Sequence, residues 1–307
     1  MQWGQIKTLF IVCFLILDVY LLVKFIDKQQ QAELSVMEQE NTSIEQQLKS
    51  ENITLPELPT NNEEEENYIS VSPRIFSEDD LSDFDNLKKA SIIDGNLIVS
   101  SFKEPISIPE NGSGSDIKSI FSDELLNIDD YRFWSWNKEL NMLIFFQEKE
   151  DRPIYYNENG IIFIFLNDDD EAIFYTQTML EKMEANGDKY PLIEPIKSIE
   201  ILYDFNELQP DDVISGIGMG FHTRLPLESG IQVFSPTWRV TVNGDRNYFV
   251  NAIEGIVYSS LDINFLKDSL IDISQKADAI SDKDYKEQVK KLLESRVNLL
   301  EGGEIEK

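Results

Sequence analysis

Residues 9–26 read LFIVCFLILDVYLLVKFI, and Asp18 and Lys24 are the only charged residues in this run. An α-helix of this length is roughly 27 Å long, close to the thickness of the hydrocarbon core of a bilayer. Lys7 precedes the run, whereas the much longer part that follows it is strongly acidic. Because positive charge stays on the cytoplasmic side, we predict a single transmembrane helix at 9–26. Residues 1–8 would then be cytoplasmic and the C-terminal part extracellular.

A cleaved signal peptide is the alternative explanation of this segment. Signal peptides end in small residues at the cleavage site. Here the chain continues after Ile26 as Asp27-Lys28-Gln29-Gln30, which offers no such site. The sequence therefore favours a permanent single-pass anchor in the cell membrane. The only cysteine, Cys13, lies within the anchor, so we expect no disulfide in the exterior part.

Asp18 lies in the middle of the predicted span, where inserting a carboxyl group costs about 3 kcal/mol. Two explanations are open: a hydrogen bond to a polar group on another transmembrane helix, or a protonated Asp tolerated in a strongly apolar helix. We favour the first, because polar side chains hydrogen-bond across helices in membranes. Helical spacing gives a predicted partner-binding face of Ile11, Phe14, Leu15, Asp18, Leu21, Leu22 and Phe25.

Residues 27–54 are predicted to continue the anchor outward as a helical stalk. The stretch 29–49 contains neither Gly nor Pro, and its apolar residues recur every three or four positions. This stalk either pairs with a second stalk or acts as a simple spacer. Residues 55–67 contain Pro56, Pro59 and four consecutive glutamates, which predict a hydrated acidic linker.

Residues 68–260 are predicted to form an extracellular α+β domain built on antiparallel sheets. Apolar runs bounded by turn residues favour strands, and 243–246 (NGDR) is a hairpin-turn signal. Strands are expected at 97–102, 131–136, 141–148, 160–166, at the start of 171–184, and at 217–225, 230–242, 247–253 and 256–258. Helices are expected at 77–90, from 115 or 116 to 126, and at 193–208.

Two features of the C-terminal half admit alternatives. Trp238 shares one strand face with Val240 and Val242, so we predict a core anchor rather than a platform for a ligand. Residues 261–307 are predicted to form a helical tail with an amphipathic helix at 281–300. The pattern leaves open whether this tail docks on the domain or on a partner.

The exterior part lacks recognisable catalytic motifs. His222 is the only histidine, which excludes histidine-based zinc sites and dyads, and we predict a structural or surface role for it. The glycines of 216–220 (GIGMG) have the wrong spacing for a phosphate loop, and they more plausibly let a strand bend or twist. Residues 168–170 (DDD) lack the ligand spacing of a calcium loop. We therefore predict no catalytic, cofactor-binding or metal-binding residues, and no enzyme activity.

The net charge of the chain limits which classes of partner it can bind. Lys and Arg number 27 against 57 Asp and Glu, which gives a formal net charge of −30. Such a chain repels nucleic acid, so a nucleic-acid partner is excluded. The abundance of acids also makes any single carboxylate pair of a glycosidase unidentifiable from the sequence.

Two stretches resemble the YycI family. Trp3 with 7–12 and 14–19 is similar to its amino-terminal anchor, whereas 235–240 (SPTWRV) followed by 248–255 (YFVNAIEG) is similar to its carboxy-terminal signature. The resemblance covers about residues 1–260. It implies an α+β exterior domain and an accessory protein of the essential sensor histidine kinase of the YycG or WalK type.

The resemblance also implies partners. YycI proteins act with a similar bitopic protein, YycH, and contact the kinase chiefly through transmembrane helices, which tunes its activity and cell-wall homeostasis in Gram-positive bacteria. We therefore expect the kinase, a YycH-like protein and the lipid bilayer as partners, with the sign of regulation open. The alternatives are an anchored wall hydrolase that uses a carboxylate pair and a bitopic structural scaffold of wall synthesis or division.

Overall fold

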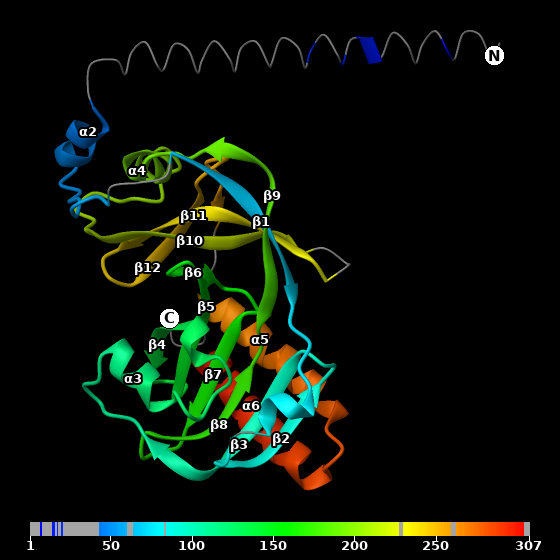
Figure 1. The fold of residues 1–307 in the computed structure, drawn as a ribbon. Helices are drawn as coiled ribbons and strands as arrows, with labels where there is room; N and C mark the ends of the chain where they lie inside the picture. Colours follow the sequence, from blue (N-terminus) through cyan, green and yellow to red (C-terminus); the bar gives the residue numbers. More distant parts are fainter. Residues whose placement is uncertain are drawn as a thin grey trace. The chain divides into compact units, whose positions relative to one another are not determined.

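The computed structural model describes residues 7, 14, 15, 17, 20, 43–59, 64–82, 84–226, 230–258 and 262–303 (Figure 1). The chain divides into two compact units. The smaller unit holds Met1–Thr54 with Gln209–Asp212, and the larger unit holds Leu55–Leu208 with Val213–Lys307.

The smaller unit contains helix α2 (Ile44–Ser50). Glu45 in its first turn and Lys49 in its last turn complement the helix dipole. After the helix, the Asn52 side chain donates to the Asp211 carboxylate at 3.1 Å, and the Thr54 amide donates to the Asp212 carbonyl at 3.1 Å. Helix α2 lies within the predicted stalk at 27–54, whose residues 27–42 lie outside the described residues. The helix ends at Ser50, so residues 51–54 are not helical, contrary to the prediction.

The predicted membrane span is described only at Phe14, Leu15, Leu17 and Tyr20, which are helical. Within the described part of the chain, we find no helix that combines the length and the apolar character needed to cross a membrane. The transmembrane helix at 9–26 stays a prediction.

The larger unit is built on a sheet of thirteen strands, which we treat as two parts. The first sheet contains β1 (Glu65–Pro73), β9 (Leu180–Pro191), β10 (Ile214–Pro226), β11 (Gln232–Val242), β12 (Arg246–Asn251) and β13 (Val257–Tyr258). The second sheet contains β2 (Leu87–Ile93), β3 (Leu97–Ser107), β4 (Tyr131–Asn137), β5 (Met142–Lys149), β7 (Ile161–Leu166) and β8 (Glu171–Gln177). Strand β6 (Arg152–Tyr155) joins them, because it pairs antiparallel with β5 and parallel with β10. The other pairings are antiparallel, so the predicted α+β class with antiparallel sheets is confirmed for the described part of the domain.

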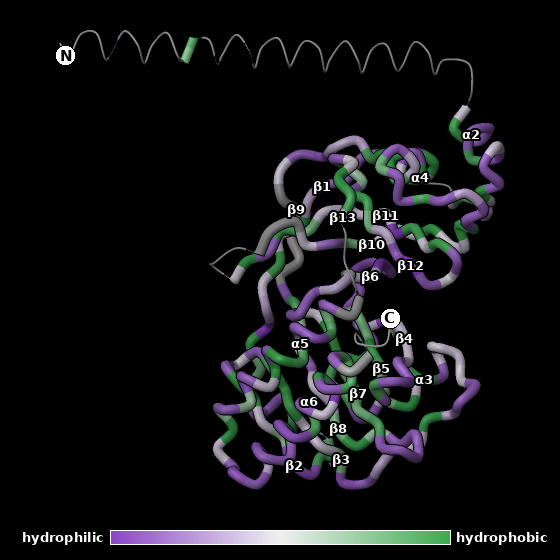
Figure 2. Tube along the Cα trace, turned by 180° about the vertical axis from the view of Figure 1, so that it is seen from behind, coloured by the Kyte–Doolittle hydropathy of each residue, from purple (hydrophilic) through white to green (hydrophobic). Residues whose placement is uncertain are grey.

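Helices cover both faces of the second sheet (Figure 1). On one face lie α5 (Asp262–Lys276), the 3-10 turn η3 (Ala277–Ala279) and α6 (Lys283–Gly303). On the other lie α3 (Gly114–Ile120) and η2 (Ile128–Asp130). Strand β7 is therefore buried on both faces, which explains its unbroken apolar run, also visible in Figure 2.

The C-terminal helices belong to the core of the larger unit. Leu270 of α5 and Tyr285, Val289 and Leu293 of α6 are buried against the same cluster as Phe163 of β7. The sequence left open whether this region docks on the domain or on a partner. The structure places it on the domain, where its apolar stripe completes the core.

The first sheet carries helix α4 (Pro195–Asp204). The hairpin between β11 and β12 turns at Asn243 and Gly244, whose φ angles of 55° and 84° are those of a type I′ turn. Trp238 is only 2% exposed, and its Nε1 donates to the Ile193 carbonyl at 2.9 Å. The prediction of Trp238 as a core anchor is confirmed.

Three sequence predictions are corrected. The helix expected at 77–90 is wrong: a short 3-10 turn, η1 (Glu78–Leu81), is followed by strand β2, which pairs with β3. The helix expected to reach Leu126 ends at Ile120. The glutamate run was expected to be hydrated linker, but β1 begins at Glu65, because Arg152 pairs with the Glu66 carboxylate.

Candidate interaction site

The structure describes little of the predicted partner-binding face of the anchor. Phe14 and Leu15 are helical and are 57% and 59% exposed. The other members, Ile11, Asp18, Leu21, Leu22 and Phe25, lie outside the described residues. The assignment of this face stays a prediction.

Strand β1 is the first element of the larger unit after the segment that leads from the predicted anchor. It pairs with β9 and with β11, so both of its edges are hydrogen-bonded. The Glu66 carboxylate receives two hydrogen bonds of 2.7 Å from the guanidinium of Arg152. This guanidinium also lies 4.4 Å from the centre of the Phe221 ring. Such bidentate pairs combine strength with fixed geometry, so the start of β1 is tied to β6.

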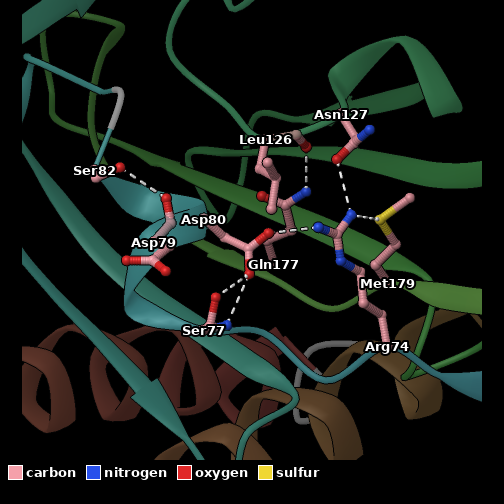
Figure 3. A network of polar contacts seen from close by, with 9 residues as sticks. All are labelled: Arg74, Ser77, Asp79, Asp80, Ser82, Leu126, Asn127, Gln177 and Met179. Atoms are coloured by element: carbon pink, nitrogen blue, oxygen red, sulfur yellow. Dashed lines mark hydrogen bonds and ion pairs between the residues drawn. The ribbon is translucent and has the colours of Figure 1, made fainter.

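The end of β1 is tied to the second sheet by Arg74 (Figure 3). One guanidinium nitrogen lies 2.5 Å from the Asp80 carboxylate, and the other donates to the Asn127 side chain at 3.0 Å. The Ser77 amide and hydroxyl donate to the same carboxylate at 2.7 and 2.9 Å. Hydrogen bonds from Ser77 and the nearby Arg74 charge lower the pKa of Asp80. We call Glu66, Arg74, Asp80, Asn127 and Arg152 the β1 joint.

Neighbouring groups hold the second-sheet side of the β1 joint in place. The Gln177 side chain of β8 donates to the Leu126 carbonyl at 2.6 Å, and Asn127 adopts a left-handed backbone conformation with φ 49° (Figure 3). The hydroxyl of the buried Tyr131 donates to the Thr178 carbonyl at 2.6 Å. Burial raises the pKa of Tyr131 well above its ordinary value, so it remains a neutral donor. The loop that presents Asn127 to Arg74 is therefore fixed.

The sheets also meet where β10 and β11 approach β4 and β6. The guanidinium of Arg239 lies 5.0 Å from the ring centre of Trp134 in β4 and 5.9 Å from that of Tyr155 in β6. A Cβ atom on Gly220 would lie 2.3 Å from the Tyr155 ring and 2.5 Å from the Pro153 carbonyl oxygen. Only glycine permits this approach. The sequence predicted that the glycines of 216–220 let a strand bend or twist. The pairing of β10 with β11 is irregular between Ile214 and Gly216, in agreement with that prediction, and Gly220 in addition lets β10 lie close to β6.

The 248–255 stretch folds into a tight polar turn against β13. The Asn251 side-chain oxygen accepts hydrogen bonds from the amides of Ile253 and Glu254 at 2.8 and 3.0 Å, and its nitrogen donates to the Tyr258 hydroxyl at 3.1 Å. The His222 ring stacks on Tyr258 with ring centres 4.6 Å apart, and burial lowers the pKa of His222. These residues therefore shape the first sheet, in agreement with a structural role for His222.

Among the described residues, His, Cys, Asp and Glu side chains form no group of three or more that could hold a metal ion. A cavity of about 10 Å³, lined in part by Glu158, Ser269 and Asp272, has room for about one water. Burial and the nearby Asp272 carboxylate raise the pKa of Glu158. The cavity is too small for an organic substrate.

Sequence reasoning missed the β1 joint. Arg74 and Asp80 are only six residues apart, but Asn127 and Arg152 come from distant parts of the chain, and no short motif contains all four residues. The one available signal was the Ser77-x-x-Asp80 spacing of a capping box, which here caps only a 3-10 turn.

Comparison with known proteins gives one informative match. Residues 31–253 match the YycI family, described as "YycI protein". No curated protein matches the chain. The chain is also similar to the crystal structure of an uncharacterized protein from Eubacterium rectale ATCC 33656. That similarity has a TM-score of 0.41 and 10% identity over 68% of this chain and 89% of the other. Because the family match spans most of the chain and contains the SPTWRV stretch of β11, the chain belongs to the YycI family.

Proposed function

We propose that this chain is a membrane-anchored accessory regulator of a sensor histidine kinase of the YycG/WalK type. It acts with a YycH-like partner and tunes kinase activity and thereby cell-wall homeostasis. The observation that carries this proposal is membership of the YycI family over residues 31–253. The apolar run at 9–26, with an acidic residue at its midpoint, supports the membrane anchor.

The contact with the kinase is made by the anchor. Asp18 hydrogen-bonds a polar group on a neighbouring helix, and the flanking apolar residues of its face pack beside it. Small differences in these contacts between two kinase states bias the equilibrium between the states. The size of that bias equals the differential contact free energy.

The exterior domain moves as one unit, and β1 connects it to the segment that leads to the anchor. Strand β1 is paired along both edges, and the β1 joint fixes both of its ends by hydrogen bonds between 2.5 and 3.0 Å. Through these contacts a movement of the exterior domain is transmitted to the start of β1 at Glu65, the end of the domain that faces the predicted linker in the sequence. This supports the exterior domain as the part on which a partner or cue acts.

A membrane two-hybrid assay tests the anchor contact. The full chain and residues 1–60 are each paired with the kinase and with the YycH-like protein, in wild-type form and as Asp18→Leu. Cys13→Leu is the matched control, because it adds the same side chain inside the span but outside the predicted face. We expect Asp18→Leu to reduce the signal by about tenfold and Cys13→Leu to leave it unchanged. Equal binding by Asp18→Leu would remove the role given to Asp18, and failure of the full chain to bind would remove the kinase.

A further inference from the structure

Strand β2 presents an open edge. It ends the strand order of the second sheet and, among the described strands, pairs only with β3. The pairing is irregular between Leu87 and Lys89 but regular from Lys89 to Ile93. A regular edge strand carries a row of N–H and C=O groups that can pair with an added strand. Residues 90–92 therefore form a template for a further strand.

A hollow of about 500 Å³ lies beside this edge. This volume is within the range of pockets that bind ligands. Residues 90–93 of β2 line it, together with Glu78 and Leu81 of η1 and residues 279–282, which run from the end of η3 to the start of α6. Ala90 is small and exposed, so the strand does not fill the space itself.

The walls of the hollow are held in place by contacts outside it. Asp80 of η1 is fixed by Ser77 and Arg74, as described for the β1 joint. The start of α6 is fixed because the Tyr285 hydroxyl lies 3.1 Å from the Val99 carbonyl and 3.3 Å from the Lys89 carbonyl. Preformed walls lower the entropy lost when a partner segment binds.

The charge of the hollow selects for a cationic partner. Its lining contains the carboxylates of Glu78 and Asp282 and no lysine or arginine. Asp282 is already paired with Lys89 at 2.6 Å, whereas we find no ion pair of Glu78 with another described residue. The net charge of −30 adds long-range attraction for cations.

We infer that β2 binds an extended cationic segment of a partner protein, which adds to the second sheet as a further strand. Main-chain hydrogen bonds to residues 90–92 supply the affinity, because the carbonyls of Lys89 and Ile93 already accept hydrogen bonds within the domain. Side chains alternate between the two faces of the sheet along an added strand. Lysines or arginines on the face that carries η1 meet Glu78, while the intervening apolar residues lie on the other face, beside Ile93 and Ile280. This surface is separate from the anchor contact and does not depend on it.

The test is fluorescence anisotropy with a labelled, capped Lys-Val-Lys-Val-Lys-Val peptide and the full-length chain in detergent micelles. Glu78→Lys reverses the charge in the hollow. Glu104→Lys is the matched control, because Glu104 is an exposed residue of β3 that does not line the hollow. We expect Glu78→Lys to weaken binding about fivefold or more and Glu104→Lys to change it less than about twofold. Ala90→Arg fills the hollow with a cation and should weaken binding to the same degree as Glu78→Lys.

A second readout locates the peptide. Amide hydrogen exchange of residues 90–92 should slow when the peptide binds, and a peptide with proline at its fourth position should not slow it. Equal weakening by Glu78→Lys and Glu104→Lys would show non-specific attraction and overturn the inference. So would the absence of binding at millimolar peptide, or protection elsewhere without protection at 90–92. Protection of these amides without peptide would show that the chain's own segment occupies the edge, which also overturns it.

Discussion

The close contact between β10 and β6 makes one substitution a sharp test of how the two sheets are joined. In Gly220→Ala the new Cβ would lie 2.3 Å from the Tyr155 ring and 2.5 Å from the Pro153 carbonyl oxygen. Both distances are far below a van der Waals contact, and the carbonyl oxygen belongs to the backbone of β6. Neither group can move aside without disturbing the pairing of Phe221 with Ile154.

The expected cost lies at the upper end of the overpacking range, about 3 kcal/mol of unfolding free energy. For a domain of this size, that loss lowers the melting temperature by roughly 6–12 °C. Gly218→Ala is the matched control. It places the same methyl group on the same face of β10, but no atom lies within 4 Å of the new Cβ. We expect it to be neutral or slightly stabilising, because glycine weakens a strand interior.

Urea denaturation of the full-length chain in detergent, followed by tryptophan fluorescence, measures both variants. Trp134 lies beside Tyr155 at 5.7 Å between ring centres, so its emission reports on this contact. In a Tyr155→Ala background, which is itself destabilised, the additional cost of Gly220→Ala should be smaller than in the wild type but not zero, because the Pro153 oxygen remains. If Gly220→Ala were as stable as Gly218→Ala, the close approach of β6 to β10 would be refuted.

Two further predictions concern α6 and His222. Leu293→Ala should lower the unfolding free energy by about 2–5 kcal/mol, because Leu293 is fully buried, whereas Leu299→Ala at a half-exposed position should cost less than about 1 kcal/mol. Equal effects in urea denaturation would contradict the packing of α6. Burial lowers the folded-state pKa of His222 below its unfolded value of 6.5, so its contribution to stability is complete above about pH 6.5 and is lost as the pH falls through the folded-state pKa. Urea denaturation at several pH values measures this. The free energy of unfolding should fall less at acid pH in His222→Gln than in the wild type, and an identical fall would show that His222 does not titrate in this way.

The strands that were predicted correctly have clear local patterns, such as an apolar run or turn residues at their ends. The run at 160–166 is apolar at every position, because β7 is covered on both faces, and the Asn243-Gly244 pair supplies the positive φ angles of its turn. Trp238 was placed correctly in the core for a similar reason, since buried and half-buried residues alternate from Trp238 to Val242 at the end of β11.

The failures share a physical cause. Residues 77–90 carry acids early and lysines late, which is a local helix signal, but pairing of 87–93 with β3 outweighs that local preference. The β1 joint and the need for glycine at 220 depend on contacts between distant segments, which no local pattern encodes. The anchor face around Asp18 remains a prediction from the sequence.

Helices α5 and α6 cover an apolar face of the second sheet, so this face is protected from aggregation only after both helices have been synthesised. Ribosomes release the strands of the second sheet first, and residues 262–303 emerge last. Until then, Val99, Ile144 and Phe163 have no helices to cover them, although their strands are complete. A chain that ends before residue 262 would leave this apolar sheet surface uncovered, and uncovered apolar surface of this kind favours aggregation.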